Sequence, residues 1–193
     1  MKLTLPTIGL LSAILATMPI AHANDQQDAA IGLMAINSGS ATITTLAPQV
    51  RTISTGVITE IELDDYKDTQ IAYKFKIIDN AAGQEHKLTY AISDGSLLRQ
   101  KSKRLSTLGF SHLDKEDRLA IEQVEKAQFD IVKKLIELET KYSAKTLEAE
   151  LESKKGIVFY EIELASSERG MQKLLINVAT GEEIPVMHRQ SHK

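Results

Sequence analysis

The sequence contains no cysteine. A chain without cysteine has no disulfide, no thiolate zinc site, no iron–sulfur cluster and no cysteine nucleophile. It must therefore rely on a hydrophobic core, and 193 residues suffice for one domain or two small ones. Positive net charge is also missing, since the formal net charge is −3. That mild acidity argues against nucleic acid and against anionic membrane surfaces as partners.

Familiar catalytic signatures are absent as well. The sequence has no G-x-S-x-G, no H-E-x-x-H, no Walker loop and no G-x-G-x-x-G motif. We therefore predict a protein that is not an enzyme and that needs no cofactor and no metal.

The N-terminus has the pattern of an export signal. Met1-Lys2 is a short positive start, Leu3 to Met18 is mostly apolar, and Ala21-His22-Ala23 is a small-x-small cleavage site. The apolar stretch is too short to span a bilayer. We predict a signal peptide over residues 1–23, cleavage after Ala23, and a periplasmic product with no membrane span.

The rest of the chain divides into five segments. Residues 24–43 form a leader, read equally well as a short helix or as a loose segment. A first unit over 44–98 begins with a helix from Thr45 to Thr55 and continues with three strands. Residues 99–114 form a basic linker. A second unit over 115–186 begins with the strongest helical pattern, Lys115 to Tyr142, and again continues with three strands, followed by a polar tail at 187–193.

The two units repeat one pattern. "AYKFKI" aligns with "FYEIEL", "TEIEL" aligns with "LEAEL", and the loop glycines Gly83 and Gly95 correspond to Gly170 and Gly181. A period near 86 residues is too long for a solenoid. The sequence therefore predicts an α+β fold made of two tandem repeats, each a helix packed on a small antiparallel sheet.

The second unit resembles a PepSY domain. The resemblance lies in "LEAELE", in "GIVFYEIEL" and in the closing "QKLLINVATGEEI", with Asn177 where the family often carries Asp. The first unit departs further from that pattern. The family occurs in propeptides of thermolysin-type metallopeptidases and in exported proteins, and the resemblance implies binding or restraint of a peptidase. The tandem layout is also reminiscent of beta-lactamase inhibitory protein, in architecture only.

Three polar clusters have a structural interpretation beside a functional one. His188 and His192, four residues apart, could grip a metal, but we interpret them as part of a polar tail. "DDYKD", residues 64–68, is acidic enough for calcium but is read as a hairpin turn. "RQKSKR", residues 99–104, could dock an anionic partner, but we interpret it as a solvated linker between the two units.

The candidate binding site is the outward face of the second sheet. Because alternate side chains of a strand point to opposite faces, one face gathers an acidic set around one aromatic ring. That set is Glu148, Glu150, Glu152, Phe159, Glu161 and Glu163. Lys173 alone stands nearby to neutralise it. The set is either a surface for a basic partner, with Phe159 as an anchor, or a solvated face that the rest of the chain covers.

These observations predict an exported, non-catalytic protein-binding module that restrains a peptidase or another envelope enzyme by covering its surface. Two other functions are compatible with the same residues: a chaperone-like or structural accessory protein, and a carrier of a small ligand.

Overall fold

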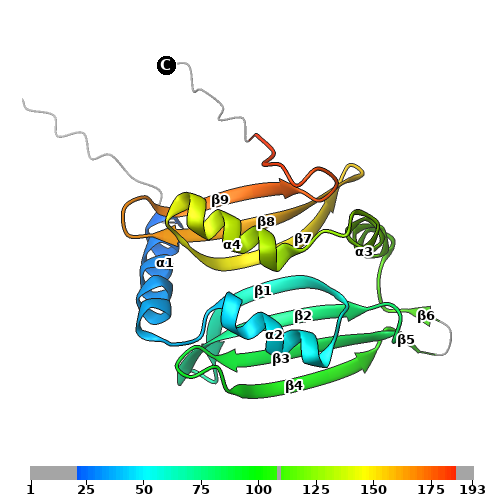
Figure 1. Cartoon of the computed structure of the whole chain (residues 1–193), viewed down its shortest axis with the longest axis horizontal. Coiled ribbons are helices and arrows are strands. Elements are labelled where there is room, and N and C mark those ends of the chain that lie inside the picture. Colours follow the sequence, from blue (N-terminus) through cyan, green and yellow to red (C-terminus); the bar gives the residue numbers. More distant parts are fainter. Residues whose placement is uncertain (1–20, 108–109, 186–193) are drawn as a thin grey trace, which may run out of the picture.

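A computed structural model describes residues 21–107 and 110–185 as an α+β fold with one seven-stranded antiparallel sheet. The order of the strands in this sheet is β4-β3-β2-β1-β7-β8-β9 (Figure 1). The strands are β1 (Val57–Tyr66), β2 (Gln70–Asp79), β3 (Gln84–Ala91), β4 (Leu97–Arg104), β7 (Lys145–Lys154), β8 (Ile157–Ser166) and β9 (Gly170–Asn177). A separate two-stranded ribbon consists of β5 (Ser106–Thr107) and β6 (Phe110–Ser111).

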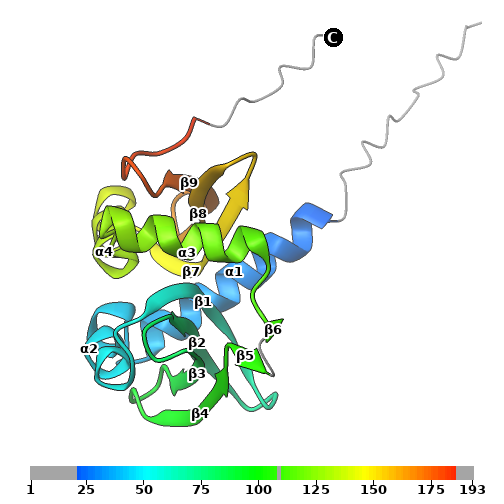
Figure 2. The same cartoon turned by 90° about the vertical axis from the view of Figure 1, so that its right-hand side faces the viewer.

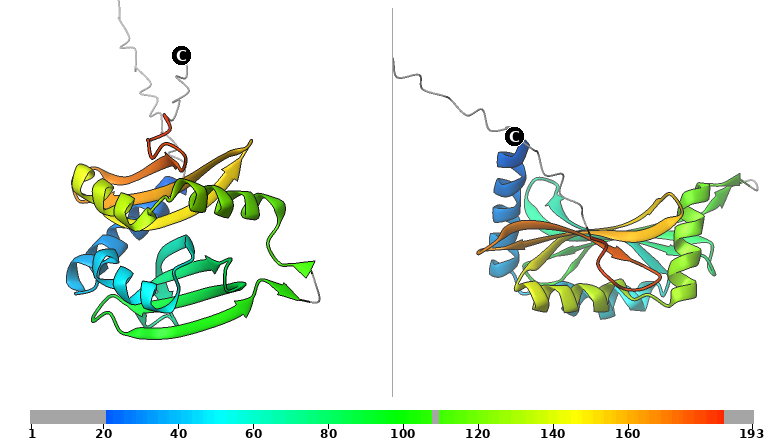
Figure 3. Two further views of the ribbon diagram at one scale, coloured as in Figure 1. Left: turned by 45° about the vertical axis from the view of Figure 1, so that its right-hand side comes forward. Right: turned by 90° about the horizontal axis from the view of Figure 1, so that it is seen from above.

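The described residues form four helices, which lie on one face of the sheet and at the ends of its strands. They are α1 (Ala21–Ser38), α2 (Ile43–Ile53), α3 (Lys115–Ala127) and α4 (Ile131–Tyr142). Figure 3 shows α2 and α4 lying on one face of the sheet, with α1 and α3 at opposite ends of the strands. The leader over 24–43 is thus largely helical, and the signal peptide predicted over 1–23 falls almost entirely outside the described residues.

The helices α2 and α4 are fixed by their caps and by their apolar faces. In α2, Thr42 and Thr45 form a reciprocal capping box, so the helix begins at Ile43, two residues before the predicted start. In α4, the Asp130 carboxylate accepts from the backbone N–H groups of Val132 and Lys133. Both helices bury most of the apolar residues that the periodicity predicts, and these face the sheet, whereas Ile136 of α4 is exposed.

The single helix predicted from Lys115 to Tyr142 is wrong, because the chain breaks at residues 128–130. Gln128 adopts a left-handed conformation with φ of 50° and ends α3, and Asp130 then starts α4. The apolar residues keep a helical spacing across the break, so the periodicity alone gave no sign of it. The break matters because α3 lies across the strand ends whereas α4 lies on the sheet (Figure 2).

The linker predicted over 99–114 is wrong for residues 99–104, which form most of β4. Nearly every side chain of β4 is exposed, so the strand has no apolar alternation from which it could have been predicted. It is held by its backbone ladder to β3, in register from Gln84–Arg104 to Tyr90–Leu97. The other six strands of the large sheet were predicted and are confirmed with small changes at their ends.

One sheet, rather than two, joins the two halves of the chain. The junction is an antiparallel pairing of β1 with β7 over Glu60–Glu150, Ile61–Ala149 and Glu62–Glu148. Two small separate sheets were predicted, and the difference follows from this pairing, which satisfies the edges of both first strands. Whether the halves are repeats of one domain stays a prediction.

Two buried tyrosines cross the junction in opposite directions. The Tyr73 hydroxyl of β2 donates to the Thr146 carbonyl of β7 at 2.8 Å, and the Tyr160 hydroxyl of β8 donates to the Ile58 carbonyl of β1 at 2.6 Å. Each acceptor stands at an irregularity in the register of its strand, between Ile58 and Glu60 or between Thr146 and Glu148. The hydroxyls thus satisfy carbonyls where the ladder is disturbed.

Candidate functional site

The sheet face opposite α2 and α4 is the candidate functional site, and we call it the open face. Among the described residues, no helix lies flat across it as α2 and α4 do across the other face (Figure 3). The helices α1 and α3 border it at the two ends of the strands. Three cavities of about 240, 480 and 320 Å³ lie along it, two of them bordered by residues of α3 or α1.

Every residue of the predicted acidic set lies on this face. Alternation in β8 buries Val158, Tyr160 and Ile162 against the helices and leaves Phe159, Glu161 and Glu163 half-buried on the other side. In β7 the same alternation buries Ala149 and places the glutamates on the open face. The structure thus places together the set Glu148, Glu150, Glu152, Phe159, Glu161 and Glu163. In the described part of the chain, the first half does not cover it.

The first half of the chain extends the acidic surface, which the alternation within each strand does not reveal. Because β1 pairs with β7, Glu60 lies directly opposite Glu150, and Glu62 directly opposite Glu148. The next strand continues both series, with Glu150 opposite Glu161 and Glu148 opposite Glu163. Two rows of three glutamates therefore run across β1, β7 and β8. We call them the glutamate rows.

Lysines neutralise the two outer ends of the glutamate rows. Lys76 lies 3.6 Å from Glu60, and Lys74 lies 3.7 Å from Glu62 and also pairs with Asp64. At the other end Lys173 contacts Glu161 at 2.7 Å and Glu163 at 3.0 Å. The hydrogen bond from Lys173 to Glu161 raises the pKa of this lysine above its ordinary value. Among the described residues, the middle glutamates on β7 have no such lysine.

The middle glutamates have raised pKa values. Partial burial raises the pKa of Glu148 first, and the charges of Glu163, Glu150 and Glu62 add to the shift. Partial burial also raises the pKa of Glu150, followed by the charges of Glu152 and Glu60. A raised pKa means that the ionised side chain is less favourable in the folded protein than in the unfolded chain. The rows are thus a local cost to stability.

This cost leads to a prediction on pH. Replacing Glu148 and Glu150 by glutamine should raise the free energy of unfolding at pH 7 by about 1 kcal/mol, because like charges opposite each other destabilise a sheet by a few tenths of a kcal/mol per pair. The native pKa values are raised, so the wild-type penalty develops as the pH rises above the ordinary value of about 4.5 and disappears below it. Urea unfolding at pH 7 and pH 4 measures the difference.

Glu161→Gln is the matched control for that prediction. It removes a glutamate from the same row but also the acceptor of the 2.7 Å contact with Lys173, so no gain is expected. A gain from the Glu148, Glu150 variant that persisted at pH 4 would contradict the electrostatic explanation.

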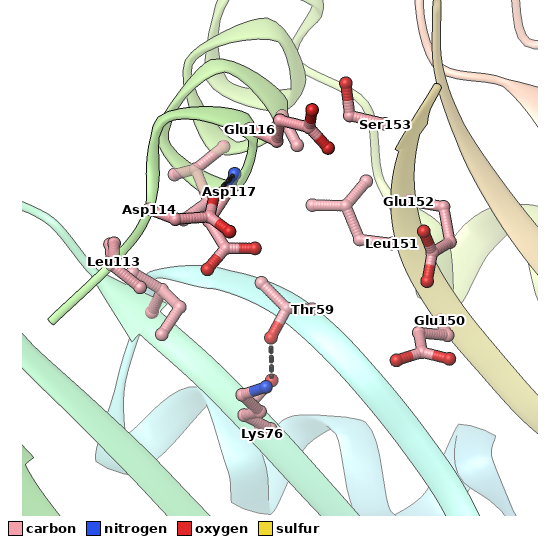
Figure 4. Close-up of a pocket in the computed structure, with 13 residues that line it drawn as sticks. Thr59, Lys76, Leu113, Asp114, Glu116, Asp117, Glu150, Leu151, Glu152 and Ser153 are labelled. Atoms are coloured by element: carbon pink, nitrogen blue, oxygen red, sulfur yellow. Dashed lines mark hydrogen bonds between the residues drawn. The ribbon is translucent and has the colours of Figure 1, made fainter. Parts of the chain in front are cut away.

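A strongly acidic cavity opens beside the glutamate rows, at the start of α3 (Figure 4). Carboxylates from α3 and β7 line it: Asp114, Glu116, Asp117, Glu150 and Glu152. Asp114 is the N-cap of α3 and accepts from the Asp117 backbone N–H at 2.8 Å. Lys76 lies at the floor, where its backbone carbonyl accepts from Thr59 (Figure 4). The cavity extends the negative surface to the end of β7.

The other polar clusters are placed as follows. The prediction of "DDYKD" as a turn is confirmed only for Lys67 and Asp68, because Asp64, Asp65 and Tyr66 still pair with β2 at the end of β1. His86 is buried, and its Nδ1 lies 2.8 Å from the Ser102 hydroxyl. The predicted tail with His188 and His192 falls outside the described residues. In residues 21–107 and 110–185, no group of three or more His, Asp and Glu side chains is arranged to hold a metal ion.

Comparisons with known proteins add little to this geometry. No protein-family model matches the chain, and no curated protein matches it significantly. Among solved structures, a predicted lipoprotein from Clostridium difficile 630 aligns with 77% of this chain and 93% of its own length, at 13% sequence identity and a TM-score of 0.40. A likeness at this level carries no argument about function. Within the described residues, no single helix is long and apolar enough to cross a membrane.

Proposed function

We propose that the protein is an exported, non-catalytic protein-binding module that holds a partner on its open face. The observation that carries the proposal is the pair of glutamate rows, which place like charges on adjacent strands of a solvent-accessible sheet face. Such an arrangement costs stability within the isolated chain. A partner that brings basic side chains to the face would turn that cost into binding energy, and complementary charge would also speed association.

An aromatic side chain stands at the margin of the acidic surface. Phe159 lies opposite Glu152 on one side and Asn177 on the other, and it is half-buried. A partly exposed aromatic ring among charged groups can supply the apolar contact that charge alone does not. This supports the interpretation of the face as an interface.

We also propose that the two halves are PepSY-like repeats. Tyr73 and Tyr160 occupy matching positions in the aligned phrases "AYKFKI" and "FYEIEL", and each donates to the other half's first strand. The acceptors Ile58 and Thr146 stand at matching register irregularities. A duplication of one ancestral unit accounts for these coincidences.

Through the PepSY resemblance, the partner we favour is a peptidase or another envelope enzyme. Inhibition would then arise by surface occlusion: the open face covers the partner's surface, and no side chain of this protein performs chemistry. On this proposal the protein is not an enzyme.

Capture by the full chain followed by an activity assay tests this function. Proteins bound to the immobilised chain would be identified by crosslinking, purified, and assayed for turnover with increasing amounts of the chain. We expect one enzyme to lose most of its activity at an equimolar ratio. We expect Glu150→Lys to weaken the inhibition at least tenfold, because it places a positive charge at the centre of a glutamate row.

The control is Glu122→Lys, which makes the same change on α3 at an exposed residue that does not line the open face. Equal inhibition by the wild type and Glu150→Lys would move the interface elsewhere. A captured protein whose turnover is unchanged but whose folded yield rises would indicate the accessory function instead. Capture of no protein would favour a small ligand.

A further inference from the structure

The open face carries charges of opposite sign on its two halves. On β2, β3 and β4 the side chains on this face include five cations: Lys74, Lys76, Lys87, Arg99 and Lys101. On β1, β7 and β8 the side chains of this face include the six negatively charged glutamates of the glutamate rows. The register places these groups in line. One row runs Lys101, Lys87, Lys76, Glu60, Glu150 and Glu161 across six adjacent strands.

Among the described residues, the ion pairs of this face form where the two signs meet, at the far edge, and between Lys103 and Glu85 at 3.1 Å. Lys76 pairs with Glu60 and Lys74 with Glu62 between β2 and β1. At the other edge, Lys173 of β9 pairs with Glu161 and Glu163 of β8. In the described part of the chain, Lys87, Arg99 and Lys101 form no ion pair. Lys87 instead lies directly opposite both Lys76 and Lys101. The basic half thus places like charges opposite each other, as the glutamate rows do.

The open face therefore has two unneutralised patches of opposite sign. The basic patch centres on Lys87 of β3, with Lys101 beside it on β4, and the acidic patch centres on Glu148 and Glu150 of β7. Three strand spacings separate β3 from β7, so the two centres are about 14 Å apart. The largest cavity of the face, about 480 Å³, lies over the basic patch and is lined by Lys87, Arg99 and Lys101.

The shape of the face argues against a second copy of this chain as the occupant. The helix α1 stands at one end of the strands and reaches past the sheet on the open side, whereas the start of α3 lies level with the strand ends on the other side (Figure 3). A second copy placed face to face would meet the protruding α1 before the two sheets touch. A narrower, convex segment fits between the helices.

We propose that the open face binds a convex segment of a partner protein that carries an acidic and a basic group about 14 Å apart. The acidic group lies over Lys87 and Lys101 and the basic group over Glu148 and Glu150. This inference rests on the proposed function and adds the chemistry and the orientation of the partner. Opposed charges at both ends fix the direction in which the segment lies, and a partner with the wrong order meets like charges at both ends.

Synthetic helical peptides provide the test. In an α-helix 14 Å corresponds to about nine residues, because the rise is about 1.5 Å per residue. One peptide has a cluster of glutamates and a cluster of lysines on the same face of the helix, each made of residues spaced three or four apart, with the cluster centres about nine residues apart. A second has the same composition with the charges alternating. Fluorescence anisotropy at low and high salt measures both affinities for the full chain.

We expect the clustered peptide to bind at least tenfold more tightly than the alternating one, and the difference to vanish at high salt. Lys87→Gln with Lys101→Gln should weaken its binding about tenfold, and so should Glu148→Gln with Glu150→Gln. The controls Glu122→Gln and Lys133→Gln, at exposed residues of α3 and α4 that do not line the cavities of the open face, should change nothing.

Three outcomes would overturn the inference. Equal affinity for both peptides would show that the two patches do not bind one segment simultaneously. No binding of the clustered peptide at millimolar concentration would show the same. An effect of the glutamate variant alone would leave the proposed function standing, with a purely basic partner. A salt-sensitive dimer of the wild type, lost in both double variants, would identify a second copy as the occupant.

Discussion

Replacing both Tyr73 and Tyr160 by phenylalanine is expected to lower the free energy of unfolding by about 2–6 kcal/mol, or about 1–3 kcal/mol for each change. Each substitution keeps the ring and removes only the hydroxyl, so the carbonyl of Thr146 or Ile58 loses its buried donor. A buried carbonyl without a partner costs its full desolvation penalty. Such a loss is a large part of the 5–15 kcal/mol by which domains are typically stable.

The hydroxyls are suited to this role because they stay protonated. Burial raises the pKa of both Tyr73 and Tyr160 well above the ordinary value, so each remains a donor at any physiological pH. The two bonds also stand beside the short β1–β7 pairing, which has three residue pairs in register. We therefore expect the double variant to weaken the junction between the halves in particular. Hydrogen exchange of the amides in β1 and β7 would detect this.

Tyr90→Phe is the matched control. Tyr90 is equally buried on the same side of the sheet, but its hydroxyl makes no hydrogen bond within the part of the chain that the structure describes. Its loss should cost well under 1 kcal/mol. If Tyr73→Phe and Tyr160→Phe cost no more than Tyr90→Phe, the hydroxyls do not hold the halves together.

Leu135→Ala is expected to destabilise the protein by about 2–5 kcal/mol. Leu135 is fully buried in the middle of α4, in the same core cluster as Tyr160 and Ile162. Truncation removes its apolar contacts and leaves a cavity that the surrounding strands cannot easily close. Urea unfolding followed by circular dichroism measures the change.

The neighbouring residue supplies the control. Ile136 is 38% exposed on the other side of the same helix, so Ile136→Ala should cost under about 1 kcal/mol. Similar losses from both variants would mean that α4 does not present this face to the sheet. Neither substitution alters the open face, and partner binding should survive in any Leu135→Ala protein that stays folded.

Much of the local structure followed from the sequence because it depends on neighbours along the chain. Alternation along β2 points Tyr73 and Phe75 inward and Lys74 and Lys76 outward, whichever strands pair with it. Most of the apolar stripe of α4 and the turn at the end of "DDYKD" followed in the same way. The break at Gln128 did not, because Phe129 and Ile131 continue a helical spacing and only a left-handed residue ends the helix.

The strand β4 could not be predicted for a different reason. Its side chains bury almost nothing, so its conformation is set by the ladder to β3 and not by its own residues. Arg99, Lys101 and Lys103 suit an exposed edge, where charge discourages pairing with other chains. In the sequence the same residues are indistinguishable from a solvated linker.

The sequence by itself determined the α+β class, the strands of the large sheet other than β4, and the acidic side of β7 and β8. Only the tertiary structure decided that β1 pairs with β7, so that Glu60 and Glu62 join the glutamate rows and the basic side chains of β2, β3 and β4 fall in line with them. Side-chain direction is a local property that repeats every two residues. The pairing of strands 86 residues apart depends instead on how the two cores pack, and no local pattern encodes it.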